Sequence, residues 1–304
     1  MSERHFADAL LDACRRKRSQ VVVGLDPRVD RLPAELRPDA TCEGRAQCVE
    51  SFNRGVIDAV ADIAAAVKLQ IAFYEQLGCA GMAAYAATIR CARERGLIVI
   101  GDIKRGDIAG TASAYAAAHL GGSAAISADF VVDAVTVNPY LGSDGVRPFV
   151  DAAAATGRGL FVLVKTSNPS AVELQDLSCG GALLHEHVAA LVEVWGAPHT
   201  GAGGYSPVGA VVGATFPDDL ARLRALMPHT LLLVPGYGAQ GGGIDDVLPA
   251  FDAAGEGAVV NSSRGIIFAW RHGPHAGRHG EGAWRDAVRA AAAEMRDALW
   301  QATH

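Results

Sequence analysis

Eight short apolar runs recur along this 304-residue chain, and each of them ends in polar or glycine residues. The runs are continuous rather than alternating in hydrophobicity, which is typical of parallel strands that are buried on both faces. They lie at residues 21–26, 65–70, 97–104, 134–139, 160–167, 209–215, 231–236 and 257–263. Because helix-like sequence separates most of them, the pattern predicts an α/β fold and favours a (β/α)8 TIM barrel over an open doubly wound sheet.

Two of the intervening segments carry apolar residues at helical spacing. One stripe consists of Phe52, Val56, Ile57, Val60 and Ile63, and a second, near the carboxyl end, of Trp284, Val288, Met295 and Leu299. The first run is followed by GLDPR and not by GxGxxG, so the dinucleotide-binding fingerprint is missing. We expect a single barrel domain over residues 1–304, with insertions near 27–50 and 168–208, the latter a lid or a dimer-side element.

Composition limits the classes of function. The chain has 27 Lys and Arg against 33 Asp and Glu, a net charge of −6, and so lacks the basic excess of a general nucleic-acid-binding protein. No apolar run reaches about 18 residues and the amino-terminal segment does not look like a signal peptide, so no membrane partner is expected. The six cysteines never form a CxxC pair and indicate free thiols in a reducing compartment. We therefore expect a cytoplasmic protein.

Polar residues at the ends of the predicted strands are the informative ones, because a barrel binds its substrate at the carboxyl ends of its strands. The strand ends carry Asp26, Lys68, Asp102, Lys104, Asn138, Lys165, Thr166, Ser167, Thr215, Ser262, Ser263 and Arg264. Three lysines and two aspartates at one barrel mouth are difficult to explain by packing alone, since charged groups in such a place need partners.

The densest segment is GDIKRGDIAGTA, residues 101–112. Asp102 and Lys104 are two residues apart at a strand end, so we expect their side chains to face the same way. Asp107 follows in a glycine-containing loop. The carboxylates would keep Lys104 charged and would repel a bound anionic substrate. A salt-bridge network at the start of a helix would explain the same spacing.

A second cluster combines PGYGAQGG, residues 235–242, with NSSRG, residues 261–265. Glycines let backbone N–H groups approach an anion, and the guanidinium of Arg264 can donate a bidentate hydrogen bond to phosphate. The loops after the seventh and eighth strands commonly bind phosphate in barrels. Ordinary glycine turns are the alternative interpretation. Together the two clusters predict a phosphate site opposite a Lys/Asp reaction centre.

Histidines do not indicate a metal site. His272, His275 and His279 are expected to be solvated loop residues, and His185 and His187 to lie on different faces of a helix. Neither a P-loop nor a GxSxG motif occurs in the chain.

The chain resembles the orotidine 5′-phosphate decarboxylase family, in its longer bacterial, type 2 form. The matching segments occur in the family's order: GLDPR, AVKLQIAFYEQLG, IGDIKRGDIAGTA, TVNPYLGSDGVRPF, VKTSNPSA, GATFP, PGYGAQGG and NSSRGI. DIKRGDI matches the DxKxxD signature of the superfamily, whose members are ribulose-phosphate-binding-barrel-like. GLDPR and PGYGAQGG separate the decarboxylase from its barrel relatives.

The resemblance implies cofactor-free decarboxylation of orotidine 5′-monophosphate to UMP in de novo pyrimidine biosynthesis, by a homodimer. By motif position, Lys104 would protonate the C6 carbanion, and Asp102 would lie beside the substrate carboxylate. Lys68 and Asp26 would hold ribose hydroxyls and complete the charged array. Asp107 would reach across the dimer interface into the neighbouring site.

The remaining substrate contacts also follow from the resemblance. They are Ser167 or Thr166 at the pyrimidine edge, Gln240 and Arg264 at the phosphate with backbone near Tyr237 and Ser263, and in addition Asn138 and Pro235. The sequence departs from the family at Ile108, where shorter members often have a polar residue, and at Ser263, where glycine is common. We expect the PGYGAQGG loop to close over the substrate.

Three other functions remain open. A metal-dependent sugar-phosphate decarboxylase or epimerase of the same superfamily would share the DxKxxD signature. A Schiff-base aldolase would use Lys165 or Lys104, although the two aspartates near Lys104 disfavour a lysine nucleophile. A barrel that only binds a phosphate ligand would gain nothing from the crowded charges of residues 102–107.

Overall fold

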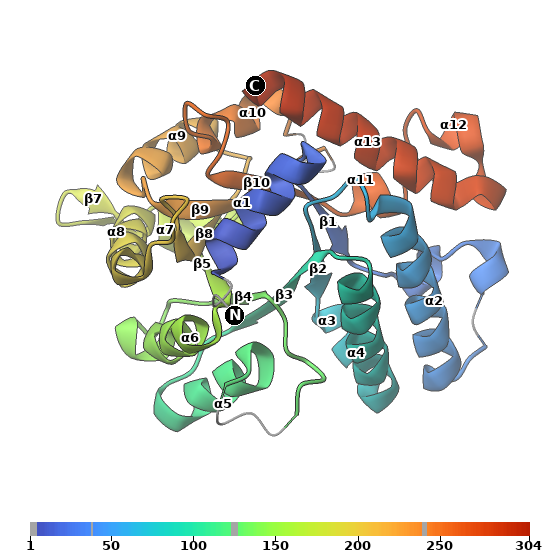
Figure 1. Ribbon diagram of the computed structural model, residues 1–304, viewed down its shortest axis with the longest axis horizontal. Coiled ribbons are helices and arrows are strands. Elements are labelled where there is room, and N and C mark those ends of the chain that lie inside the picture. Colours follow the sequence, from blue (N-terminus) through green and yellow to red (C-terminus); the bar gives the residue numbers. More distant parts are fainter. Residues whose placement is uncertain (1–4, 38, 123–126, 239–241) are drawn as a thin grey trace. The chain divides into compact units, whose positions relative to one another are not determined.

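The computed structural model describes residues 5–37, 39–122, 127–238 and 242–304. Eight parallel strands form a closed barrel in the order β1-β10-β9-β8-β5-β4-β3-β2 (Figure 1). They are β1 Val21–Leu25, β2 Ala66–Gln70, β3 Ile98–Arg105, β4 Ala134–Val137, β5 Gly159–Lys165, β8 Ser206–Val212, β9 Thr230–Pro235 and β10 Ala258–Ser262. Each predicted apolar run overlaps one of them, so the predicted TIM barrel is confirmed.

Helices connect the strands. They are α1 Phe6–Lys17, α2 Cys42–Val60, α3 Ala72–Glu75, α4 Gly78–Glu94, α5 Ala109–Leu120, α6 Ser143–Thr156, α7 Val172–Gln175, α8 Leu184–Gly196, α9 Pro217–Leu226, α10 Ile244–Val247, α11 Arg264–Ile267, α12 Ala276–His279 and α13 Trp284–Thr303. Short 3-10 helices occupy Val29–Arg31, Ala34–Leu36, Pro169–Ala171, Ala197–His199, Leu248–Ala250 and Glu281–Ala283. Within the described residues, no helix has both the length and the apolar character needed to cross a membrane.

Contacts divide the chain into two compact units. The first unit comprises Met1–Asp12, Lys104–Asn261 and Gln301–His304, and the second comprises Ala13–Ile103 and Ser262–Trp300. A single domain over residues 1–304 stays a prediction. The two units are described in turn below.

In the second unit, strands β1, β2 and β3 pair in parallel, and α2 lies beside α4 (Figure 1). Both predicted apolar stripes are buried. The indole of Trp284, at the start of α13, stacks on Phe52 of α2 with ring centroids 5.0 Å apart. A Cβ on Gly55 would lie 2.5 Å from this indole, so the close approach requires glycine. The stripes therefore build the core of this unit.

In the first unit, β4, β5, β8 and β9 pair in parallel, and α5 lies beside α6 (Figure 1). Phe6 of α1 contacts Phe161 of β5 edge to face, with ring centroids 5.8 Å apart. Asp8 of the same helix accepts hydrogen bonds from Ala202 N at 3.1 Å and Gly203 N at 2.7 Å. These bonds fix the glycine-rich stretch before β8.

The two long connections contain more regular structure than the sequence suggested. The connection over 27–50 includes the first half of α2, which begins after the cap that Thr41 Oγ1 provides to Gly44 N at 3.0 Å. The connection over 168–208 includes all of α8. Before α8 it contains a two-stranded antiparallel sheet, β6 Ser178–Cys179 and β7 Ala182–Leu183.

Candidate active site

In the second unit, three predicted residues form a buried charge cluster. Lys68 lies in β2, Asp102 in β3, and Asp26 directly after β1. Lys68 Nζ donates a hydrogen bond to Asp102 Oδ2 at 2.7 Å and lies 4.0 Å from Asp26 Oδ1. Lys68 and Asp102 are each only 5% exposed. The neighbouring strands thus bring together three of the predicted catalytic and ribose-binding groups.

The charge on Lys68 is stabilised by its neighbours. Burial opposes the charged form, but the carboxylates of Asp102 and Asp26 outweigh it and raise the pKa of Lys68 above its ordinary value. Lys68 is therefore a fixed positive charge at neutral pH.

Gln70 belongs to the same cluster and was not among the predicted residues. Its Nε2 donates to Asp102 Oδ2 at 3.0 Å, so one carboxylate oxygen accepts two hydrogen bonds. The signal was present in the sequence, because residues two apart on a strand face the same side and Gln70 follows Lys68 at that spacing. Asp26 Oδ1 is buried and accepts no hydrogen bond from the described residues.

In the first unit, Lys104 is exposed and has a positive φ of 46°. A non-glycine residue in this region costs on the order of 1–3 kcal/mol, and such residues gather at functional sites. Its backbone N–H is held by Thr136 Oγ1 of β4 at 2.9 Å. The positive φ interrupts the regular strand geometry, so the two-residue alternation we used for Asp102 and Lys104 does not fix the direction of the lysine side chain.

Asp107 and Asn138 lie in the loops that follow β3 and β4. Asp107 Oδ1 accepts a hydrogen bond from Ile108 N at 2.8 Å, and Asn138 Oδ1 accepts one from Tyr140 N at 3.0 Å. Asn138 N in turn donates to Arg105 O at 2.8 Å. These contacts fix the two loops against each other next to the candidate proton donor.

Lys165 ends β5 and is fully buried. Its Nζ forms an ion pair with Asp176, lies 3.6 Å from Asp219 Oδ2 and lies 4.7 Å from the centre of the Phe216 ring. The hydrogen bond from Lys165 to Asp176, together with the charges of Lys165 and His185, holds the pKa of the Asp176 carboxyl below its usual value. These interactions outweigh burial, which would raise that pKa. This lysine is paired, unlike the desolvated amine of a Schiff-base enzyme.

Asp176, His185 and Asp219 are a group of described residues whose ligand atoms lie close enough to hold a metal, all within 4.8 Å. The Lys165 ammonium already pairs with Asp176 and lies 3.6 Å from Asp219 Oδ2. His185 Nδ1 lies 2.9 Å from Gln175 O, a contact that needs a proton on Nδ1 because a carbonyl only accepts. A metal would have to displace both groups, so the arrangement is that of a lysine-centred ion cluster.

Thr166 and Ser167 follow Lys165 and differ in their contacts. The Thr166 hydroxyl donates to Asn168 Oδ1 at 2.6 Å and accepts from Gln175 Nε2 at 2.7 Å. The Ser167 hydroxyl makes no hydrogen bond within the part of the chain that the structure describes. Of the two hydroxyls, only that of Thr166 is therefore hydrogen-bonded to Asn168 and Gln175.

The predicted phosphate residues are placed in part. Pro235 ends β9, and the backbone after it turns at Gly236 and Gly238, whose φ values are 107° and 74°. Gly238 N donates to Gly242 O at 2.8 Å. Gln240 lies outside the described residues, as does the middle of the loop we expect to close.

Ser263 and Arg264 belong to the second unit. Ser263 is half-buried at the cap of α11, and Arg264 is exposed at its first residue. In the same unit, His275 corrects an expectation, because it is buried and its Nε2 lies 3.0 Å from Glu294 Oε2 of α13. The expectation of a solvated His275 is wrong.

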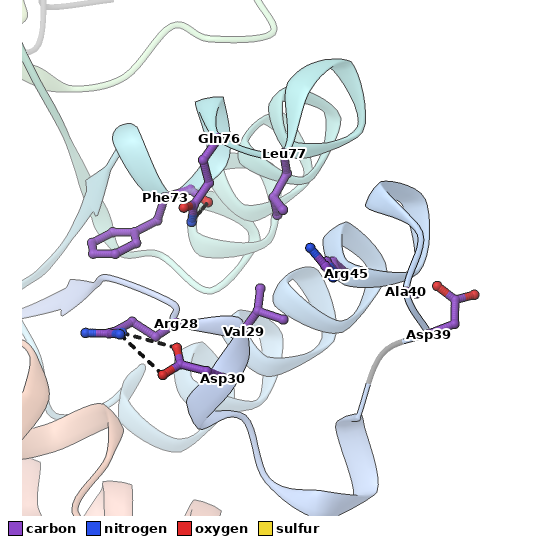
Figure 2. Close-up of a pocket in the computed structure, with 9 residues that line it drawn as sticks. All are labelled: Arg28, Val29, Asp30, Asp39, Ala40, Arg45, Phe73, Gln76 and Leu77. Carbon is purple, nitrogen blue, oxygen red and sulfur yellow. Dashed lines mark hydrogen bonds and ion pairs between the residues drawn. The ribbon is translucent and has the colours of Figure 1, made fainter.

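A hollow of about 710 Å³ lies in the second unit (Figure 2). Its lining residues are Arg28, Val29, Asp30, Asp39, Ala40, Arg45, Phe73, Gln76 and Leu77. Figure 2 shows Arg28 joined to Asp30 by two hydrogen bonds of 3.2 Å. None of the predicted site residues lines it, so it adds nothing to the candidate site.

Comparisons with known proteins identify the family. The model of the orotidine 5′-phosphate decarboxylase / HUMPS family matches residues 19–274. An orotidine 5′-phosphate decarboxylase from Rhodopirellula baltica is 49% identical over 298 residues, which cover 97% of this chain and 98% of the relative. One from Caldicellulosiruptor saccharolyticus is 39% identical over 280 residues, covering 89% and 92%. The solved structure of Leishmania donovani OMP decarboxylase has a TM-score of 0.77 and 33% identity, covering 98% of this chain and 99% of that one. This chain belongs to the orotidine 5′-phosphate decarboxylase family.

Proposed function

We propose that Lys104 supplies the proton in the reaction that this chain catalyses, the decarboxylation of orotidine 5′-phosphate to UMP in pyrimidine biosynthesis. The bond between C6 and the carboxylate breaks, CO2 leaves, and the electron pair stays on C6. A proton moves from Lys104 Nζ to C6, and the lysine regains a proton from water. A charged amine stabilises the carbanion and protonates it, so one side chain serves both needs.

The observation that carries the proposal is the buried contact between Lys68 and Asp102. Lys68 Nζ and Gln70 Nε2 hold the same oxygen of Asp102 at 2.7 and 3.0 Å, so this carboxylate cannot turn away when a second negative group binds. Placed beside the substrate carboxylate, it repels the ground state, and loss of CO2 removes that repulsion. Such an interaction differs between substrate and transition state, which is what accelerates a reaction.

Asp26 and Lys68 are proposed to hold the ribose. Asp26 Oδ1 is a buried acceptor without a donor among the described residues, and a sugar hydroxyl is a donor of the right kind. Lys68 has three donor positions, of which Asp102 occupies one. The ribose hydroxyls would thus meet one acceptor and one donor.

For the pyrimidine edge we propose Ser167. Its hydroxyl is uncommitted within the described residues, whereas that of Thr166 both donates and accepts. In this proposal Thr166 does not touch the pyrimidine and instead holds the backbone next to Ser167 in place.

For the phosphate we propose Arg264, the backbone at Ser263 and the turn that begins at Pro235, together with Gln240. Arg264 is exposed and so able to meet a ligand, and a guanidinium matches phosphate geometry. Binding energy from a group remote from C6 can be used at the reacting carbon.

We also propose a homodimer in which Asp107 serves the neighbouring site. Three large apolar side chains are exposed on the loops near it: Ile108 at 53%, Tyr140 at 80% and Leu141 at 47%. Such surface is costly in water and is typical of an interface. Cofactor independence and a cytoplasmic location stay predictions of the sequence.

The test follows the absorbance of orotidine 5′-monophosphate with purified protein in excess EDTA, for the wild type and Lys104→Ala. Turnover in the wild type with a loss of at least about a hundredfold in the variant supports the proposal. Turnover that EDTA abolishes would favour the metal-dependent sugar-phosphate alternative. Unchanged turnover in Lys104→Ala would keep the reaction and overturn the role of this lysine.

A further inference from the structure

The segment that follows β5 folds back onto the end of that strand. After Lys165, Thr166 and Ser167 the chain forms a 3-10 turn and the short helix α7, and Gln175 and Asp176 come back to within hydrogen-bond distance of Thr166 and Lys165. This segment belongs to the part of the long connection that precedes α8.

Gln175 clamps Thr166 with both ends of its carboxamide. Its Oε1 accepts from Thr166 N at 2.9 Å, and its Nε2 donates to Thr166 Oγ1 at 2.7 Å. A residue gripped by its backbone N–H and by its side chain together can neither rotate nor shift along the chain. The peptide bond from Thr166 to Ser167 starts from this fixed point.

A second set of contacts fixes Gln175 itself. The carbonyl of Gln175 accepts from His185 Nδ1 at 2.9 Å, and the next residue, Asp176, is paired with the fully buried Lys165. His185 Nδ1 also lies 3.2 Å from Asp176 Oδ1. Lys165 in turn is held by the backbone that follows the neighbouring strand β8, since its carbonyl accepts from Gly213 N at 2.8 Å. The clamp is thus tied to the barrel wall through an ion pair that solvent does not reach on the lysine side.

On the other side, Ser167 has little freedom to move toward its neighbour strand. A Cβ on Gly213 would lie 3.0–3.1 Å from the backbone and Cβ of Ser167, so the two segments are in close contact. Ser167 therefore stands between the Gln175 clamp and the backbone after β8, with its hydroxyl uncommitted to described residues.

We propose that Gln175 is a positioning residue for the pyrimidine contact, acting through Thr166 on Ser167, with Lys165 and Asp176 as its anchor. This inference rests on the proposed role of Ser167. It assigns to the long connection a function in substrate alignment, since a misplaced contact of even about 1 Å can cost a large factor in rate.

A double-mutant cycle tests the proposal, with kcat and KM for orotidine 5′-monophosphate measured for Gln175→Ala, Ser167→Ala and the double variant. Each single variant should lose about tenfold in kcat/KM, which is the factor expected when the free energy of one or two neutral hydrogen bonds is lost. If Gln175 acts through Ser167, the double variant should lose no more than Ser167→Ala alone, to within about twofold. Glu173→Ala is the matched control, because Glu173 is exposed on the same short helix, and it should behave as the wild type.

Gln175→Glu covers the case in which Gln175→Ala does not fold. It keeps an acceptor for Thr166 N–H and loses the donor to Thr166 Oγ1, so we expect a smaller loss than in the alanine variant and the same dependence on Ser167. Losses that multiply in the double variant would overturn the proposal and assign Gln175 to general stability. A Ser167→Ala variant with full activity would overturn the pyrimidine contact and the inference with it. A wild type that leaves the substrate unchanged would instead reject the decarboxylase activity.

Discussion

Lys68 Nζ and Asp102 Oδ2 lie 2.7 Å apart, on adjacent strands and with both side chains 7% exposed. A pair so deeply buried is costly to break, because removing one partner leaves a charge without compensation. The same contact, which we propose holds Asp102 beside the substrate carboxylate, also contributes to the stability of the barrel wall, and these two effects can be separated by mutation.

Lys68→Ala should lower the free energy of unfolding by about 3–5 kcal/mol, since Asp102 stays buried and loses its ion pair. It should also lower kcat by at least about a hundredfold, the cost of removing one aligned electrostatic group. Urea unfolding and the absorbance assay measure the two effects. Lys68→Ala/Asp102→Ala is the control, and it should recover part of the stability and none of the activity. A double variant as unstable as the single one would contradict this account of the buried charge.

Arg264→Ala should reduce kcat/KM for orotidine 5′-monophosphate by about a hundredfold or more, because a charge-assisted bidentate contact to phosphate is lost. With orotidine, which has no phosphate, the same variant should match the wild type. The measurement is kcat/KM of the wild type and of Arg264→Ala with each of the two substrates at the same ionic strength. An equal loss on the two substrates would assign Arg264 to the fold or to the pyrimidine.

The barrel could be predicted because strands buried on both faces are continuous in hydrophobicity, a signal that lies within each segment. The start of β8 is the instructive error: we predicted 209–215, whereas β8 begins at Ser206. Ser206 and Pro207 have the composition of a turn, and proline is rare within strands. Here Ser206 Oγ is buried and accepts from Val208 N at 2.9 Å.

Within the site, charged residues at strand ends could be predicted, and the spacing of Gln70 from Lys68 was also visible, but the supports that come from distant segments were not. The clamp of Gln175 on Thr166 joins residues nine positions apart through a turn that periodicity does not reveal. The contact of His275 with Glu294 joins it to a separate helix, α13. The positive φ of Lys104 likewise follows from tertiary contacts and has no local sequence signal such as glycine.

Asp176 gives a prediction about pH. Its pKa is lowered in the folded state, chiefly by the hydrogen bond from Lys165, so its contribution to stability is present above its unfolded value and is lost as the pH falls through the folded one. Asp176→Asn should therefore lower Tm at pH 7 by about 2–4 °C, the shift that about 1 kcal/mol produces in a large domain.

The difference in Tm between the wild type and Asp176→Asn should stay constant down to about pH 5 and should shrink below about pH 4. Thermal unfolding between pH 3 and pH 7 measures it. Asp218→Asn serves as the control, because Asp218 is exposed at the start of α9 and makes no hydrogen bond or ion pair with the described residues. A gap that does not depend on pH would show that the variant acts through packing and not through the carboxylate charge.

Gly55 tests the packing of the second unit. Gly55→Ala would place a methyl group 2.5 Å from the Trp284 indole and should lower the free energy of unfolding by about 1–3 kcal/mol. Gly110 on α5 is the matched control, since a Cβ there meets nothing within 4 Å, and Gly110→Ala should be neutral or stabilising by about 0.5–1 kcal/mol. Chemical unfolding compares the two. Equal effects would mean that helix propensity, and not the contact with Trp284, decides the cost.

Asp107 gives the sharpest test of a shared site. If Asp107 of one subunit completes the site that holds Lys104 of the other, Lys104→Ala and Asp107→Ala homodimers are both impaired, whereas a mixed dimer contains one intact site and one doubly altered site. Mixing the two variants in equal amounts after unfolding and refolding should then restore about one quarter of the wild-type activity, because half of the dimers are mixed and each has one working site of two. Refolding each variant alone is the control. If both residues acted within one subunit, no mixture would exceed the activity of its parts.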